Sequence, residues 1–111
     1  MNAGNRLERE LAGWATVERA GVHVTPRSAS ITLTPSDDVA DEELASLVAK
    51  ASVEAAYAMP WIGSLEFQLS GRAITIEWDS VAKYVARDLT LVEFHDTWTI
   101  NGESLPAPAG H

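Results

Sequence analysis

The segment from about Pro35 to Met59 constrains the fold more than any other part of the chain. Its start suits a helix N-terminus, because Thr34 or Ser36 can cap the helix and proline fits the first helical position. The first turns are acidic, as the helix dipole favours, with Asp37, Asp38, Asp41, Glu42 and Glu43. Pro60 disfavours helical geometry in the residue before it. The pattern therefore predicts one long amphipathic helix.

Apolar residues cover more of this predicted helix than a single packed face requires. One stripe consists of Leu44, Leu47, Val48, Ala51 and Ala55, and a second apolar flank consists of Ala45, Ala49, Val53 and Ala56. The polar edge is narrow and holds Glu43, Ser46, Lys50 and Glu54. A surface helix with a sheet on one side needs only one apolar stripe. We therefore expect a second packing partner for this helix.

Two hairpins are expected around the helix. Apolar residues alternate with polar ones over residues 65–69, and Ser70-Gly71 suits a two-residue turn. Pairing across that turn sets Phe67 opposite Ile74 and Leu65 opposite Ile76, which gathers the apolar side chains on one face. An earlier hairpin is predicted across residues 22–33, with Pro26 in the favoured second place of its turn.

The remaining segments give the element order. Residues 5–20 favour a helix that Gly21 would end, or a helix that ends near Gly13 and is followed by a strand. Residues 80–87 favour a short helix, residues 89–95 and 97–100 favour strands, and Asn101-Gly102 favours a turn that would set Trp98 opposite Leu105.

The element order predicts an α+β fold, an antiparallel sheet with one long amphipathic helix packed on it. The middle of the chain follows the ferredoxin-like βαββαβ order, with an added N-terminal helix and a C-terminal hairpin. The length of 111 residues fits a single domain over 1–111, and we expect flexible ends at 1–4 and 106–111.

Charge and composition exclude several classes of function. The net charge of −8 disfavours direct nucleic-acid binding and leaves a partner with a basic face, which includes a protein that the chain would block as a nucleic-acid mimic. The absence of cysteine removes disulfides, thiolate metal sites and cysteine nucleophiles. We expect a cytoplasmic protein that does not enter a membrane, because neither a signal-peptide pattern nor a spanning apolar run is present.

The clearest candidate for catalysis is Glu93, His95 and Asp96. In a strand, Glu93 and His95 would share a face, and a carboxylate beside an imidazole can orient it for acid–base work. Tyr84 and Trp98 would line the pocket. The alternative is a surface turn with no chemical role. The acids of residues 37–43 lack the spacing of a calcium loop, so we expect no metal and no cofactor.

The tryptophans point to recognition. Trp61 lies in an apolar loop with Met59 and Ile62, and such a loop either packs under the core or contacts a partner. We therefore expect a small acidic protein–protein interaction module, such as an adaptor, inhibitor or regulatory subunit, with a protein partner and a homodimer as its assembly. The alternative is a small-ligand-binding protein or enzyme with a helix/sheet pocket that uses Glu93 and His95.

Overall fold

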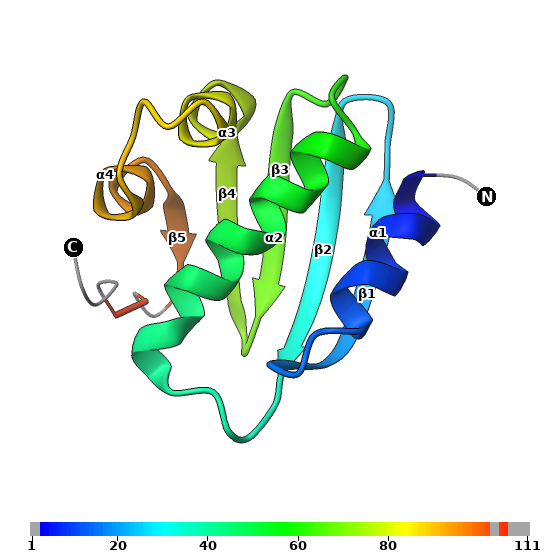
Figure 1. Cartoon of the computed structure of the whole chain (residues 1–111), viewed down its shortest axis with the longest axis vertical. Coiled ribbons are helices and arrows are strands. Elements are labelled where there is room, and N and C mark those ends of the chain that lie inside the picture. The colour runs from blue at the N-terminus through cyan, green and yellow to red at the C-terminus, as the bar shows by residue number, and fades with distance from the viewer. Residues whose placement is uncertain (1–2, 103–104, 107–111) are drawn as a thin grey trace.

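The computed structural model describes residues 3–102 and 105–106 as five strands with helices on one side (Figure 1). The elements are α1 (Ala3–Ala12), β1 (Val17–Val24), β2 (Ser28–Pro35), the 3₁₀ helix η1 (Asp41–Glu43), α2 (Leu44–Ala58), β3 (Ser64–Leu69), β4 (Arg72–Glu77), α3 (Trp78–Val85), α4 (Leu91–Asp96) and β5 (Thr99–Asn101). The predicted α+β class is confirmed.

The sheet is mixed, and its strands lie side by side in chain order from β1 to β5. β2 and β3 are parallel, whereas the other neighbours are antiparallel. The expectation of a purely antiparallel sheet was therefore wrong. Because α2 carries the chain back across the sheet between β2 and β3, the two strands run in the same direction. The ferredoxin-like arrangement is not confirmed, since the strand order is sequential.

The two predicted hairpins are present. β3 and β4 pair with Phe67 opposite Ile74 and Leu65 opposite Ile76, and all four of these side chains are buried. Ser70 and Gly71 both have positive φ at the turn, as a two-residue hairpin turn of the primed type requires. β1 and β2 form the earlier hairpin. The N-terminal helix ends at Ala12, so the reading with a helix followed by a strand is correct.

The central helix begins later than the sequence indicates. Pro35 closes β2, where it pairs with Val17, and the acidic residues form a loop and the short helix η1 before α2 starts at Leu44. Leu33 continues the buried apolar alternation of β2 up to this point. Sheet pairing therefore outcompetes helix propensity at the first predicted turn.

The strand expected over residues 89–95 was wrong, because helix α4 begins at Leu91. Thr90 caps α4 through a reciprocal capping box: its hydroxyl accepts the Glu93 N–H at 3.2 Å, and its own N–H donates to the Glu93 carboxylate at 2.9 Å. The sequence Thr-x-x-Glu is a helix-start signal that outweighs the β-favouring residue Val92.

The C-terminal strand β5 pairs with β4 through Ile100 and Ile74. The second arm of the expected hairpin, which would set Trp98 opposite Leu105, includes residues 103–104 and lies outside the described residues. Of the two ends expected to be flexible, residues 1–2 and 107–111 also lie outside them, while Ala3 and Gly4 belong to α1.

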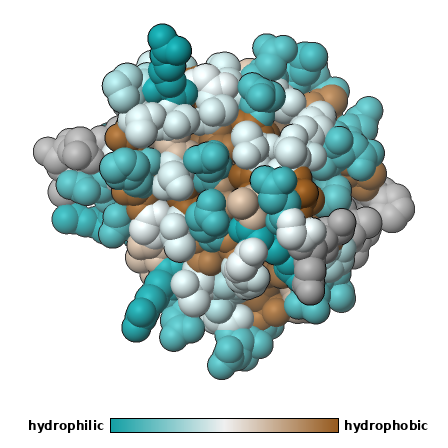
Figure 2. Space-filling view, turned by 180° about the vertical axis from the view of Figure 1, so that it is seen from behind, coloured by the Kyte–Doolittle hydropathy of each residue, from teal (hydrophilic) through white to brown (hydrophobic). Residues whose placement is uncertain are grey.

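The helices cover one face of the sheet and leave the other open. α1 and α2 cross in front of the strands, and α3 and α4 lie beside β4 and β5 (Figure 1). The buried face is built from alternate strand residues, among them Ile31, Leu33, Phe67 and Ile76. Viewed from behind, the sheet presents mostly polar and neutral side chains (Figure 2), including Ser30, Thr32, Glu66, Gln68 and Thr75. In the described ranges, no helix combines the length and apolarity that a membrane span needs.

Candidate interaction surface

The broad apolar arc of α2 is covered within the chain itself. Nine of its fifteen residues are buried, and α2 contacts α1, α3 and α4 in addition to the core under it. The arc that suggested an external partner therefore packs against the chain's own helices. The width of this arc gives no support to self-association.

The exposed aromatic residues lie instead at the end of α2 and in the loop that follows it. Trp61 is 57% exposed and Tyr57, in the last turn of the helix, is 73% exposed. Met59 and Ile62, which were expected to contact a partner together with Trp61, are 0% and 2% exposed and belong to the core. The loop thus does both things that were considered for it: its flanks pack inward while Trp61 faces solvent.

The backbone around Trp61 is held in place. The Met59 N–H donates to the Ala55 carbonyl at 2.8 Å, and the Gly63 N–H donates to the Arg27 carbonyl at 2.7 Å. The Gly63 carbonyl in turn accepts the Trp78 N–H at 3.0 Å. Helix α2, the β1–β2 turn and the start of α3 therefore fix the loop, so little conformational entropy is lost when Trp61 contacts a partner.

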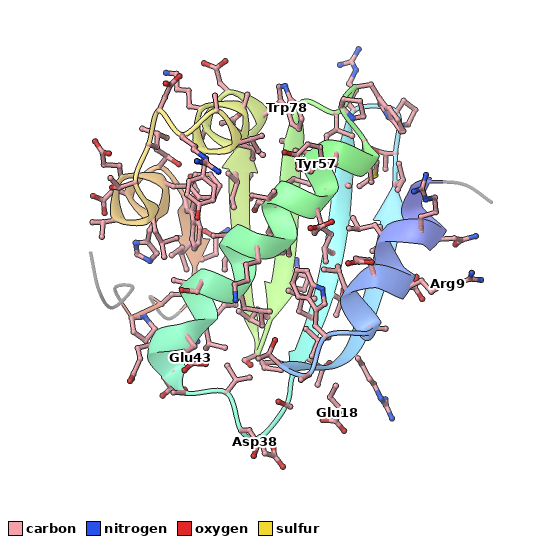
Figure 3. The ribbon with its side chains drawn as sticks, in the orientation of Figure 1. Arg9, Glu18, Asp38, Glu43, Tyr57 and Trp78 are labelled. Atoms are coloured by element: carbon pink, nitrogen blue, oxygen red, sulfur yellow. The ribbon has the colours of Figure 1, made fainter. Side chains whose placement is uncertain are left out.

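The exposure of Tyr57 was not predicted, although the sequence contains a pattern that indicates it. The polar edge of α2 runs through Glu43, Ser46, Lys50 and Glu54 at helical spacing, and the next position on that edge is Tyr57. An aromatic residue that continues a polar stripe is predicted to be exposed. Figure 3 shows Tyr57 on the outward side of α2. Tyr57 and Trp61, both strongly exposed and four positions apart in the chain, are named here the Tyr57–Trp61 surface.

Two hollows along α2 adjoin this surface. The smaller, about 280 Å³, lies between α1 and the end of α2 and is lined by Arg6, Leu7, Glu10, Glu54, Tyr57 and Ala58. The larger, about 510 Å³, shares Glu54 with it and is lined by Trp14, Ala15, Thr16, Lys50, Val53, Glu54 and Tyr84. Because the two hollows share Glu54, they form a groove along α2 that begins at Tyr57 and that Trp14 and Tyr84 line farther along.

The charged side chains of this groove are available to a partner. Arg6, Glu10, Lys50 and Glu54 form neither ion pairs nor hydrogen bonds through their side chains with any residue in the described part of the chain. Groups of both signs therefore line a groove that also exposes tyrosine and tryptophan rings. This mixture of aromatic anchors and a polar rim is typical of protein-binding surfaces.

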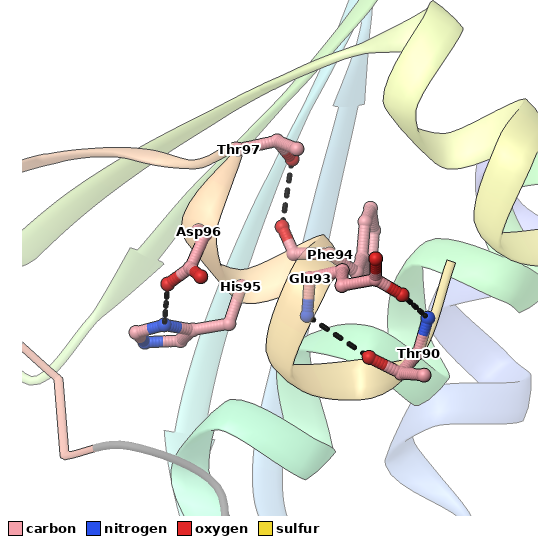
Figure 4. A network of polar contacts seen from close by, with 6 residues as sticks. All are labelled: Thr90, Glu93, Phe94, His95, Asp96 and Thr97. Carbon is pink, nitrogen blue, oxygen red and sulfur yellow. Dashed lines mark hydrogen bonds and ion pairs between the residues drawn. The ribbon is translucent and has the colours of Figure 1, made fainter. Parts of the chain in front are cut away.

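The Glu93–His95–Asp96 group is not assembled for acid–base chemistry (Figure 4). The three residues lie on helix α4, where positions two apart do not face each other, so the expected side-by-side placement on a strand was wrong. The Glu93 carboxylate is engaged in the capping box. Among the described residues, the carboxylate that pairs with His95 is that of Asp96, with Nδ1 and Oδ1 3.9 Å apart.

The aromatic residues near His95 form a closed cluster. Tyr84 stacks on Phe94 with ring centres 4.3 Å apart, and Trp98 meets Phe94 edge-on at 5.4 Å. The His95 ring lies 4.9 Å from Trp98, and His95 Nε2 and Trp98 Nε1 are both buried without a hydrogen-bond partner. Tyr84 lines the larger hollow, but Glu93, His95 and Trp98 do not, so this hollow is not the pocket that was expected around His95. The cluster therefore packs α3 against α4.

The other candidate groups remain apart. His23 lies on the edge strand β1, while His95 lies on α4 beyond the opposite edge of the sheet (Figure 1). Asp38 and Glu43 project at one end of the molecule (Figure 3). Across residues 3–102 and 105–106, no group of three or more histidine or acidic side chains is placed to hold a metal ion.

Comparisons with protein-family models, curated proteins and solved structures found no match to this chain.

Proposed function

We propose that this chain is a small acidic protein–protein interaction module that binds its partner through the Tyr57–Trp61 surface. The carrying observation is the outward placement of Trp61 on a loop whose two flanking residues, Met59 and Ile62, are buried in the core. Tryptophan and tyrosine are enriched among the residues that dominate binding energies, and such anchors act best when they are held rigidly.

The neighbouring groove supports the same proposal. A partner seated on Tyr57 and Trp61 reaches Arg6, Glu10 and Glu54 at the smaller hollow, where it finds charged groups of both signs. These groups give specificity at the rim, while the aromatic rings supply the apolar contact area. The net charge of −8 favours a partner with a basic face and speeds its approach.

The enzyme alternative lacks a comparable arrangement. Glu93 serves the start of α4, and the covered His95 packs against Trp98. General acid–base catalysis requires the acid and the base to reach one substrate atom. We therefore argue for binding and not for a reaction.

The test is affinity capture from cells of the source organism with three immobilised forms of the chain: the wild type, Trp61→Ser and Lys83→Ser. Lys83 is the control, because it is exposed on α3 away from the groove. We expect a partner that the wild type and the Lys83 variant capture in stoichiometric amounts and that the Trp61 variant loses. Capture of the same partner by all three forms would contradict the proposal, as would the absence of any stoichiometric partner.

A further inference from the structure

At the outer edge of β1, a backbone N–H is bonded to a side chain of helix α1. The Val22 N–H donates to the Glu8 carboxylate at 3.3 Å, so it points away from β2. Conversely, the Thr25 N–H donates to the Ser28 carbonyl at 2.8 Å, within the β1–β2 hairpin. Residues alternate along an antiparallel ladder, so Ala20 and Val24 also direct their N–H and C=O groups outward.

The same three residues present a small apolar row. Ala20, Val22 and Val24 pair with Leu33, Ile31 and Ala29, which are buried on the helix side of the sheet. On β1 this row is only partly covered, and Val24 remains 36% exposed. Ala20 and Val22 pack against the core, so the edge offers outward backbone groups at three positions and an exposed apolar side chain at Val24.

We propose that the outer edge of β1 is a strand-addition site for β1 of a second copy of this chain, and that Glu8 keeps it closed in the monomer. An antiparallel pairing of identical strands about a two-fold axis is self-complementary. The register that uses all three outward positions sets Val22 opposite Val22 of the second copy and Ala20 opposite Val24. The other edge strand, β5, has three residues, against eight in β1.

Glu8 controls access to the edge because an added strand needs the Val22 N–H that the Glu8 carboxylate occupies. Edge strands are commonly protected by charged side chains, and here the Glu8 carboxylate accepts the outward Val22 N–H at 3.3 Å. This inference is independent of the Tyr57–Trp61 surface, which lies on α2 and its following loop.

The experiment compares the wild type, Glu8→Ala and Glu10→Ala by sedimentation equilibrium over a series that reaches about 1 mM protein. Glu10 is the matched control, because it lies on the same helix and carries the same charge but leaves the strand edge untouched. We expect Glu8→Ala to tighten dimerisation by about tenfold, since dimer formation no longer breaks a charge-assisted hydrogen bond, and Glu10→Ala to match the wild type.

A second substitution tests the geometry. Val22→Pro added to Glu8→Ala removes the outward donor without touching the β1–β2 ladder, and we expect a folded monomer. If that chain fails to fold, Val24→Lys in the same background places a charge on the edge and is expected to give a monomer as well. Trp61→Ser should leave the dimer unchanged.

Three results would overturn the inference: a Glu8→Ala chain that stays monomeric throughout the series, a dimer that survives the edge substitution, or open-ended assembly in place of a dimer. Amide exchange provides a separate readout. In concentrated Glu8→Ala protein the Val22 amide should be protected, and dilution should remove that protection.

Discussion

Two groups of aromatic residues in this molecule differ in burial: one packs inside the fold and the other is exposed to solvent. Tyr84, Phe94 and Trp98 contact one another at 4.3 and 5.4 Å between ring centres and hold α3 and α4 together. Tyr57 and Trp61 are 73% and 57% exposed and hold nothing together. The first group is explained by the stability of the fold. The second contributes little to burial, and its exposure is the observation on which the proposed binding role rests.

The largest expected effect is at the centre of the buried group. Phe94→Ala should lower the free energy of unfolding by about 3–5 kcal/mol, because Phe94 is fully buried and both Tyr84 and Trp98 lose their contact with it. Urea denaturation followed by circular dichroism measures this change. A loss under about 1 kcal/mol would mean that the cluster is not close-packed, and the contrast with Trp61 would disappear.

The next effect concerns the helix that presents Phe94. Thr90→Ala removes the hydroxyl that accepts the Glu93 N–H and should cost about 1 kcal/mol. Thr34→Ala, on the open face of the sheet, is the control for a threonine without this role. The same urea titration compares the two variants. Equal losses would show that the capping box does not determine why residues 91–96 are helical.

The smallest effect on stability is expected at the exposed group. Trp61→Ser and Tyr57→Ser should each change the free energy of unfolding by about 0.5 kcal/mol or less, since neither side chain is buried. If Trp61→Ser lowered the free energy of unfolding by about 2 kcal/mol, Trp61 would contribute to stability as the buried aromatic residues do. That result would remove the main support for the proposed binding surface.

Local signals in the sequence were reliable where neighbouring residues decide the structure. The β3–β4 register follows from the alternation of residues 65–76 and the Ser70-Gly71 turn, and the structure reproduces it pair by pair. The strand predicted over residues 89–95 was wrong because two local signals compete there. Val92 favours a strand, whereas Thr90 and Glu93 favour a helix start, and the capping box is formed.

The candidate site could be predicted only in part. Trp61 was identified from its apolar loop, but the sequence could not separate it from Met59 and Ile62, which share that loop and are buried. Exposure depends on which way each side chain points after the loop has been pinned to Arg27 and Trp78. Glu8 gave no signal at all, because its role depends on Val22, fourteen positions away in the chain.

By itself, the sequence determined the α+β class, the two hairpins and an α2 helix that is apolar over more than one side, because turn chemistry and residue periodicity are local properties. Only the tertiary structure decided what covers that helix. α1, α3 and α4 pack around it, although a helix wheel cannot tell a neighbour in the same chain from a partner. The parallel pairing of β2 with β3 and the contact of Glu8 with Val22 were likewise decided by folding, since each joins segments whose proximity no local pattern encodes.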